Sequence, residues 1–423
     1  MTRNGVVTNT RAATPDVELP DDEAAQLAAR PHGYLRDRED EDAARVSFVE
    51  LFFDLVFVFG ITQLAAYLAD NITPEGIVRV SVMFVAVWWL WINTAWATNR
   101  LDPDRALVRL VIFVLLGAGL VFSTGIPVAF EERAMAFATA YVGIQVARSL
   151  FMVWALRTHE EHGEARHFLR VGIWFALSGV LWIAGALAVA DARVVLWLLA
   201  AATDLLVPWI GFRLPGLGRS STHEWDIEGE HLAERCALFI IIALGESLLV
   251  TGGRLGEAEW NAAVWAAFGV AVMGSLAMWW IYFDTGAKRG TRAFEEAHDS
   301  GRLARFAYTY VHMPIVAGIV VAAVGDKFLL AHPGDPADWP AALALLGGPA
   351  LFLLGNFLFK NATSRRWPIS HVIGLVLLGA GLFLAGSMTI LGVAAYGFAA
   401  LLVVAALERA LLYSRTADRQ GLK

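Results

Sequence analysis

The sequence predicts an all-α protein, a polytopic membrane helix bundle of about 12 transmembrane helices. Hydrophobic residues make up 57% of the 423 residues and charged residues only 17%, too apolar for a soluble domain of this length. The apolar residues come in runs of about twenty, the length that a helix needs to cross the hydrocarbon core of a bilayer. The chain contains 16 Trp, and many lie near run ends, as membrane interfaces favour.

These apolar runs follow one another along the chain with short polar connections. The fifth and sixth are separated only by residues 191–193, so their shared boundary is the least sharply defined. An even number of crossings places both chain ends on the same side of the membrane. The predicted spans lie near residues 46–68, 77–97, 106–126, 134–156, 168–190, 193–212, 231–252, 261–283, 303–323, 340–360, 369–387 and 389–412.

Lys and Arg are distributed unevenly between the two sets of loops. Most of them lie in the loops on the N-terminal side, and the opposite loops carry few. Cytoplasmic loops are enriched in Lys and Arg, so we expect a bacterial inner-membrane protein with both termini in the cytoplasm. The few basic residues of the opposite loops are Arg79, Arg133, Arg193, Arg254 and Lys327.

The predicted domains follow from these runs. Residues 1–45 are acidic, contain no long apolar run and are predicted to be a disordered cytoplasmic tail. A first transmembrane half (46–212), a cytoplasmic linker (213–230), a second half (231–412) and a short cytoplasmic tail (413–423) complete the chain. The lipid bilayer is the expected partner, nucleic acid is not, and a homo-oligomer is left open.

A weak internal repeat relates the two halves. The second run ends in WWLWIN (88–93) and the eighth in WWIYFD (279–284), with two tryptophans and an aromatic residue in register. The first and seventh runs both open with an acid and later carry a glycine followed by polar residues. Two six-helix halves with the same orientation would produce this pattern, as in parallel-repeat transporters. Separate selection of tryptophan at each interface would also produce it.

Two carboxylates lie inside the first predicted span. Glu50 and Asp54 are four residues apart, so they share one helix face. At 1.5 Å per residue, Asp54 lies about 12 Å beyond the start of the run, where an acid costs about 2.5–3.5 kcal/mol on insertion scales. We therefore expect a partner or a water-filled cavity, and Arg109 or Arg148 is the favoured counter-charge within the first half.

The second half offers its own charged residues near the cytoplasmic side. Glu234 or Asp284 is expected to pair with Arg305 or Arg235. Such pairs have two interpretations, a substrate or ion pathway and a purely structural link between helices.

The seventh and ninth runs carry polar residues deeper in the membrane. Glu246 follows Gly245 past the middle of its run, and His312 is near the middle of the ninth. A contact between them would make a proton-relay element, because neutral histidine titrates near physiological pH. Alternatively, His312 bonds a carbonyl that Pro314 leaves free, since proline donates no backbone hydrogen bond. Asp204 is a weaker candidate of the same kind.

Several chemistries find little support. The acidic and histidine-rich stretch 223–231 lies in a loop that leads into a helix, so a metal site is not predicted. The single cysteine, Cys236, excludes a disulfide within the chain and a multi-cysteine metal site. No Walker motif is present. We therefore predict no cofactor and a protein that is not an enzyme.

Two blocks of the sequence resemble a known family. The block from Phe48 to Leu64, FVELFFDLVFVFGITQL, and the block from His231 to Ser247, HLAERCALFIIIALGES, are similar to motifs of the bacterial low temperature requirement protein A family. The resemblance spans residues 45–412. It implies a polytopic inner-membrane protein and a link, by name, to growth in the cold. It singles out Glu50, Asp54, Glu234 and Glu246 but transfers no catalytic role to them.

The leading functional hypothesis is an ion- or proton-coupled transporter or permease in which Asp54 and Glu246 bind a proton or a small cation. Glu50, Glu234, His312 and Asp284 are accessory candidates, with Arg148 and Arg235 as counter-charges. The alternative is a membrane sensor or scaffold whose buried ion pairs only hold helices together.

Overall fold

The computed structural model describes residues 33–37, 45–221, 227–284, 300–364 and 367–419. Within these ranges, twelve helical segments are long and apolar enough to cross a membrane. The helices are α2 (Phe48–Asp70), α3 (Pro74–Thr98), α4 (Ala106–Gly125), α5 (Ala134–Thr158), α6 (His162–Leu187), α7 (Ala190–Leu206), α8 (Gly229–Glu257), α9 (Ala262–Tyr282), α11 (Ser300–Leu303), α12 (His312–Ala331), α13 (Trp339–Ser364), α14 (Ile369–Leu384) and α15 (Ile390–Arg419). Short η segments complete them: η1 (Ile126–Val128), η2 (Val207–Ile210), η5 (Ala304–Tyr310) and η6 (Ala385–Ser387).

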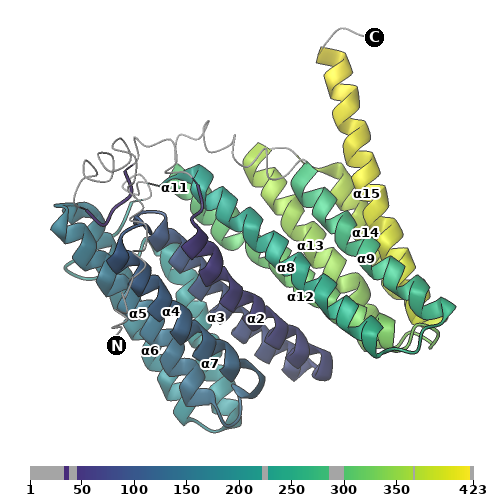
Figure 1. The fold of residues 1–423 in the computed structure, drawn as a ribbon, viewed down its shortest axis with the longest axis horizontal. Helices are drawn as coiled ribbons and strands as arrows, with labels where there is room; N and C mark the ends of the chain where they lie inside the picture. The colour runs from purple at the N-terminus through teal and green to yellow at the C-terminus, as the bar shows by residue number, and fades with distance from the viewer. Residues whose placement is uncertain (1–32, 38–44, 222–226, 285–299, 365–366, 420–423) are drawn as a thin grey trace, which may run out of the picture. The chain divides into compact units, whose positions relative to one another are not determined.

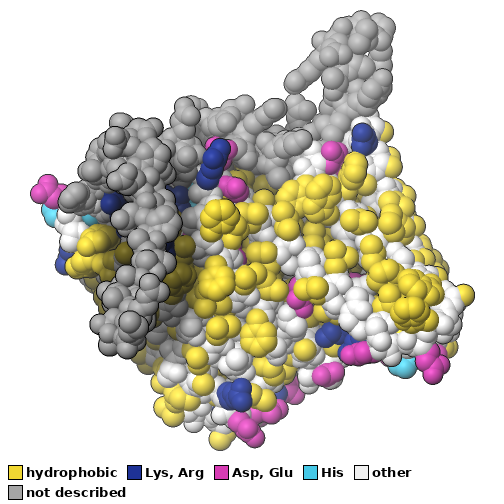
Figure 2. Space-filling model, in the orientation of Figure 1, with side chains coloured by type: hydrophobic (Ala, Val, Ile, Leu, Met, Phe, Trp, Pro, Cys, Tyr) yellow, Lys and Arg dark blue, Asp and Glu magenta, His cyan; other side chains and the backbone are white. Residues whose placement is uncertain are grey.

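The predicted fold class is confirmed. The described residues form only isolated β-bridges besides helices, and each predicted apolar run corresponds to one membrane-length helical segment. Apolar side chains cover much of the face in Figure 2, with charged side chains along its lower edge. Large apolar side chains at the surface, such as Phe383 at 93% exposure and Leu249 at 70%, suit contact with lipid.

Helix α2 begins with a capping box. The Ser47 hydroxyl accepts from the backbone N–H of Glu50, and the Glu50 carboxylate accepts from the backbone N–H of Ser47. This arrangement satisfies two backbone donors at the helix start and holds the Glu50 side chain against it. Helix α2 then packs against α3 and α4 on one side and against α8 and α12 on the other (Figure 1).

The neighbours of corresponding helices match between the two halves. In the first half α2 contacts α3 and α4, α4 contacts α5, and α3 contacts α7. In the second half α8 contacts α9 and α12, α12 contacts α13, and α9 contacts α15. This correspondence supports the six-helix repeat, which stays a prediction. The equivalent first helices, α2 and α8, contact each other directly.

Helices α12 and α13 approach closely through glycines. A Cβ added to Gly318 would lie 2.3 Å from the Phe352 amide nitrogen, and one added to Gly348 would lie 2.5 Å from that of Ala322. Small residues at such crossings let helix backbones meet, which is the usual basis of tight packing within membranes.

A π-helical turn, η5, precedes α12. Two tryptophans of α3 donate to it, Trp88 to the Thr309 carbonyl (2.7 Å) and Trp96 to the Thr309 hydroxyl (2.9 Å). These bonds connect α3 to the segment that enters α12. π-turns are often found at functional sites, and this one lies beside His312.

Candidate functional site

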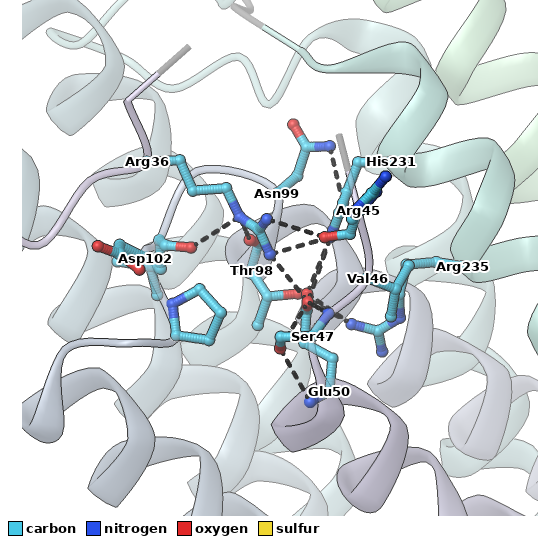
Figure 3. Close-up of polar contacts among 12 residues, drawn as sticks. Arg36, Arg45, Val46, Ser47, Glu50, Thr98, Asn99, Asp102, His231 and Arg235 are labelled. Atoms are coloured by element: carbon cyan, nitrogen blue, oxygen red, sulfur yellow. Dashed lines mark hydrogen bonds and ion pairs between the residues drawn. The ribbon is translucent and has the colours of Figure 1, made fainter. Parts of the chain in front are cut away.

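A buried ion cluster joins α2 to α8. We use this name for Arg36, Glu50, Asp54, His231 and Arg235, most of which Figure 3 labels. The side chains of Glu50, His231 and Arg235 are fully buried, and Asp54 also has 0% exposure. His231 and Arg235 lie in the first two turns of α8, and Glu50 and Asp54 lie in the first two turns of α2. Arg36 precedes α2 in the chain.

Glu50 is the most completely bonded acid of the cluster. Arg235 donates to its Oε1 at 2.9 Å, and Arg36 donates to its Oε2 at 2.8 Å. His231 Nε2 lies 3.1 Å from Oε1, and the Ser47 amide and hydroxyl both donate to Oε2 at 3.0 Å. So many donors stabilise the charged carboxylate and hold it in one position.

Asp54 lies one helical turn deeper and has fewer partners. Its Oδ1 accepts from Arg235 Nη2 at 2.6 Å and from the Trp91 indole at 2.8 Å. Its Oδ2 is buried and has no hydrogen-bond partner among the described residues. A buried carboxylate oxygen without a donor carries a desolvation cost of about 1–3 kcal/mol or more. Among the described residues, Asp54 Oδ2 is the only carboxylate oxygen of the cluster without a donor.

Arg235 connects the two acids. Its Nη1 donates to Glu50 and to the Thr98 hydroxyl (3.1 Å), while Nη2 donates to Asp54. The guanidinium also lies 5.9 Å from the Trp91 ring centre. A planar guanidinium that bonds both α2 carboxylates from α8 couples the positions of the two helices.

Arg36 comes from the predicted disordered tail. Its Nε donates to the carbonyls of Thr98 (3.1 Å) and Leu101 (3.0 Å), and its side chain is only 8% exposed. Leu35 also bridges to Leu101, so this short part of the predicted tail packs on the helices and supplies a second cation for Glu50. The prediction of disorder for the rest of residues 1–45 stays a prediction. Residues 1–32 and 38–44 of that tail lie outside the described residues.

The predicted counter-charges for the first-half acids are wrong. Arg109 lies 3.5 Å from Asp104, in the loop that connects α3 and α4. Arg148 is buried and donates to the Leu90 carbonyl (3.3 Å), the Thr94 hydroxyl (3.0 Å) and Gln145. The acids of α2 pair instead with Arg235, from the other half.

Arg148 belongs to a second buried network, in the first half. Its partner Gln145 donates to the Tyr141 hydroxyl at 3.2 Å, and Tyr141 donates to Asp204 Oδ2 at 2.8 Å. The Trp182 indole donates to the same oxygen at 3.1 Å. A chain of hydrogen bonds thus connects one buried cation with one buried acid across α5, α6 and α7.

Two predicted acids lie away from the cluster. Glu234 is exposed and accepts from the Val46 amide at 3.1 Å, so it contacts the start of α2 rather than Arg305. Asp284 is also exposed. Among the described residues, no ion pair joins these acids to Arg235 or Arg305. Arg235 points inward to Glu50 and Asp54, and Arg305 donates to the Pro208 carbonyl at 2.8 Å, so the predicted pairing is wrong.

Glu246 and His312 lie in separate environments. Glu246 is 6% exposed, with Thr62 and Lys327 as its polar neighbours. His312 is fully buried, with Nε2 2.9 Å from the Tyr282 hydroxyl and Nδ1 2.8 Å from the Ala307 carbonyl. Both ring nitrogens of His312 thus have partners other than Glu246. The structure fits the alternative in which His312 bonds a backbone carbonyl, and that carbonyl belongs to Ala307 in the π-helical turn η5.

Two further buried charged residues, Lys360 and Asp326, were not among the site predictions. Lys360 donates to Glu408 at 2.7 Å and to the Ile281 carbonyl at 3.1 Å. Asp326 is 8% exposed and lies among hydroxyl groups of α8. The Ser47-x-x-Glu50 capping pattern was a readable signal for the helix start, but no local pattern marks Lys360 or Asp326.

An apolar cavity of about 590 Å³ lies between α2, α3, α12, α13 and α14. Its lining is aliphatic and aromatic apart from Ser81, so it suits an apolar group better than an ion. Among the described residues, no three His, Cys, Asp or Glu side chains are grouped so that they could hold a metal ion.

The membrane-length helices and the buried ion cluster define a multi-pass helical membrane protein. Residues 45–407 match the sequence profile of the bacterial low temperature requirement A protein (LtrA), and the chain belongs to this family, as its two sequence blocks predicted. It is 40% identical over 382 residues to an uncharacterised protein of Rhizobium meliloti, an alignment that covers 90% of this chain and 93% of the relative. No solved structure matches the chain.

Proposed function

We propose that this protein is an ion- or proton-coupled permease in which the buried ion cluster responds to binding at Asp54. The observation that carries the proposal is the unpartnered Oδ2 of Asp54, in a fully buried carboxylate within a membrane span. Ionisable groups at such positions mark ion and proton pathways. A proton or cation that binds there weakens the attraction between Asp54 and Arg235.

The position of the cluster supports a coupling role. Asp54 is on α2 and Arg235 on α8, the first helices of the two predicted halves. A ligand that favours the unpaired state of these residues shifts the equilibrium toward an arrangement with a looser α2–α8 contact. Glu50 keeps Arg36 and His231 when Arg235 moves, so it acts as the anchor of the cluster.

Glu246 is the second acid of the proposed pathway. It lies eleven residues beyond Arg235 on α8, about 16 Å along the helix axis. The cluster and Glu246 therefore mark two depths along the same helix. His312 and Asp284 are not in the cluster, and we assign them no step in ion movement.

The proposal includes location and orientation. The loop charges favour the cytoplasmic membrane of a bacterium with both termini in the cytoplasm. The ion cluster then lies near the cytoplasmic ends of α2 and α8. The activity is transport rather than enzyme chemistry, and self-association is left open.

A scaffold role is the second candidate. The completeness of the bonding around Glu50 favours it, because a carboxylate with four donors and a contact to His231 contributes to a unique helix packing whether or not anything is transported. Both candidates predict a loss of stability when the cluster is broken, but only the permease predicts a loss of flux in folded variants.

Asp54→Asn tests the permease proposal. Asparagine keeps the acceptor for Trp91 but removes the titratable group and the charge. We expect flux in liposomes, followed as internal pH under imposed Na⁺, K⁺ and pH gradients, to fall by about tenfold or more. The matched control is Asp335→Asn, at a side chain that is 66% exposed. Wild-type flux in a correctly folded Asp54→Asn protein would contradict the proposal, as would wild-type protein that moves none of these ions.

A further inference from the structure

Asp326 is a buried acid of α12 that the ion cluster does not use. Its Oδ2 lies 3.2 Å from the Ser247 hydroxyl and 3.5 Å from the Thr251 hydroxyl, both on α8. Ser247 in turn lies 3.4 Å from the Ser275 hydroxyl of α9. All four side chains are buried. Side-chain oxygens from three helices of the second half thus form a connected buried group, and Asp326 and Ser275 line the same small cavity.

The bonding of Asp326 is incomplete. None of the ion pairs among the described residues includes this carboxylate, whose polar neighbours are Ser247 and Thr251. Hydrogen bonds from hydroxyls to carboxylates are normally about 2.5–2.7 Å long, much shorter than these separations. Thr251 also lies 2.8 Å from the Ser247 backbone carbonyl, the better acceptor for its hydrogen. The buried carboxyl group of Asp326 therefore has only long contacts to hydroxyl groups.

The same distances match the spacing of ligands around a cation. An ion with metal–oxygen distances of about 2.4 Å places adjacent octahedral ligands about 3.4 Å apart. The three separations of 3.2, 3.4 and 3.5 Å lie close to this value. Mg²⁺, with metal–oxygen distances of about 2.0–2.1 Å, requires closer oxygens.

The charge of the site favours a monovalent ion. Asp326 supplies one negative charge, and the other three oxygens are neutral hydroxyls. The nearby Glu246 has a positively charged neighbour in Lys327, so its charge is balanced outside the site. A single carboxylate offsets one positive charge in a buried position and leaves a divalent ion undercompensated.

Space for a further ligand is present beside the carboxylate. A cavity of about 40 Å³ touches Asp326 and Ser275 and extends between α9, α12, α13 and α15. This volume holds a water molecule. Four protein oxygens and one water would give a sodium ion a normal oxygen coordination.

We propose that Asp326, Ser247, Thr251 and Ser275 bind a Na⁺-sized monovalent cation. The site is distinct from the ion cluster, since Ser247 lies twelve residues beyond Arg235 on α8, about 18 Å along the axis. Binding at this site does not depend on the permease proposal, because it is measured without transport. If transport is shown, the site supplies the coupling ion.

The test is the thermal unfolding of the full-length protein in detergent, with NaCl replaced by choline chloride at constant ionic strength. A ligand that binds only the folded state raises the melting temperature with increasing concentration. We expect a saturable rise with Na⁺ and a much smaller one with K⁺, whose larger radius does not fit the oxygen spacing.

Variants locate the effect. Asp326→Asn removes the charge of the site. Thr251→Val removes one hydroxyl and keeps the side-chain shape, so it provides the test if the Asp326→Asn protein does not fold. Each should raise the half-saturating Na⁺ concentration by about tenfold or more. The matched control is Thr203→Val, at a half-buried threonine of α7 whose hydroxyl bonds a carbonyl of its own helix. Equal melting in Na⁺ and choline, an equal response to K⁺, or an unchanged Na⁺ response in both site variants would overturn the proposal.

Discussion

Replacing Arg235 with methionine is expected to lower the free energy of unfolding by about 3–5 kcal/mol, because it leaves buried carboxylates without their shared cation. Glu50 retains Arg36 at 2.8 Å, but Asp54 keeps only the Trp91 indole. The measurement is thermal or denaturant unfolding of the purified protein in detergent. Arg254→Met is the matched control, since Arg254 forms an exposed pair with Glu257 worth about 0–1 kcal/mol.

A double variant separates charge from packing. Asp54→Asn with Arg235→Met removes both charges of the pair and should recover part of the stability that Arg235→Met loses. The coupling arises because an unpaired buried charge costs more than a neutral side chain in its place. Additive losses, with the double variant less stable than either single one, would show that the pair is not the source of the effect.

Burial of the two α2 acids could be predicted from the sequence, but their partner could not. The hydrophobic length of each run and the four-residue spacing of Glu50 and Asp54 are local properties, and these expectations agree with the structure. Arg235 lies 181 residues beyond Asp54. The prediction chose cations at a similar depth within the first half, so it favoured Arg109 or Arg148, although α2 packs against α8 across the two halves.

The burial of Asp326 and Lys360 was missed because the sequence places both residues at or beyond the ends of predicted spans. Asp326 lies just beyond the expected end of its run at residue 323, but α12 continues to Ala331, so the carboxylate is inside a membrane span. Lys360 was expected at a span end, yet its amine is buried against Glu408 of α15. Which face a residue presents depends on helix packing that hydrophobicity alone does not specify.

The glycine contact between α12 and α13 determines how these two helices pack beside α8 and α2. Gly318 and Gly348 each meet the opposite backbone at distances that no Cβ tolerates. An alanine at either position must push the helices apart, because the atoms it meets belong to backbone rather than to a flexible side chain. This displacement would also shift Asp326 on α12 relative to the hydroxyls of α8.

Gly318→Ala and Gly348→Ala are therefore each expected to destabilise the protein by about 1–3 kcal/mol or more, measured as a lower melting temperature in detergent. Gly269→Ala on α9 is the matched control, because a Cβ there meets nothing within 4 Å. Alanine favours the helix over glycine by up to about 1 kcal/mol, so this control should melt at or above the wild-type temperature. A clash with rigid backbone can be relieved only by separating the helices. If the α12 and α13 variants also melt at or above the wild-type temperature, this separation costs no stability, and the close crossing does not determine the packing.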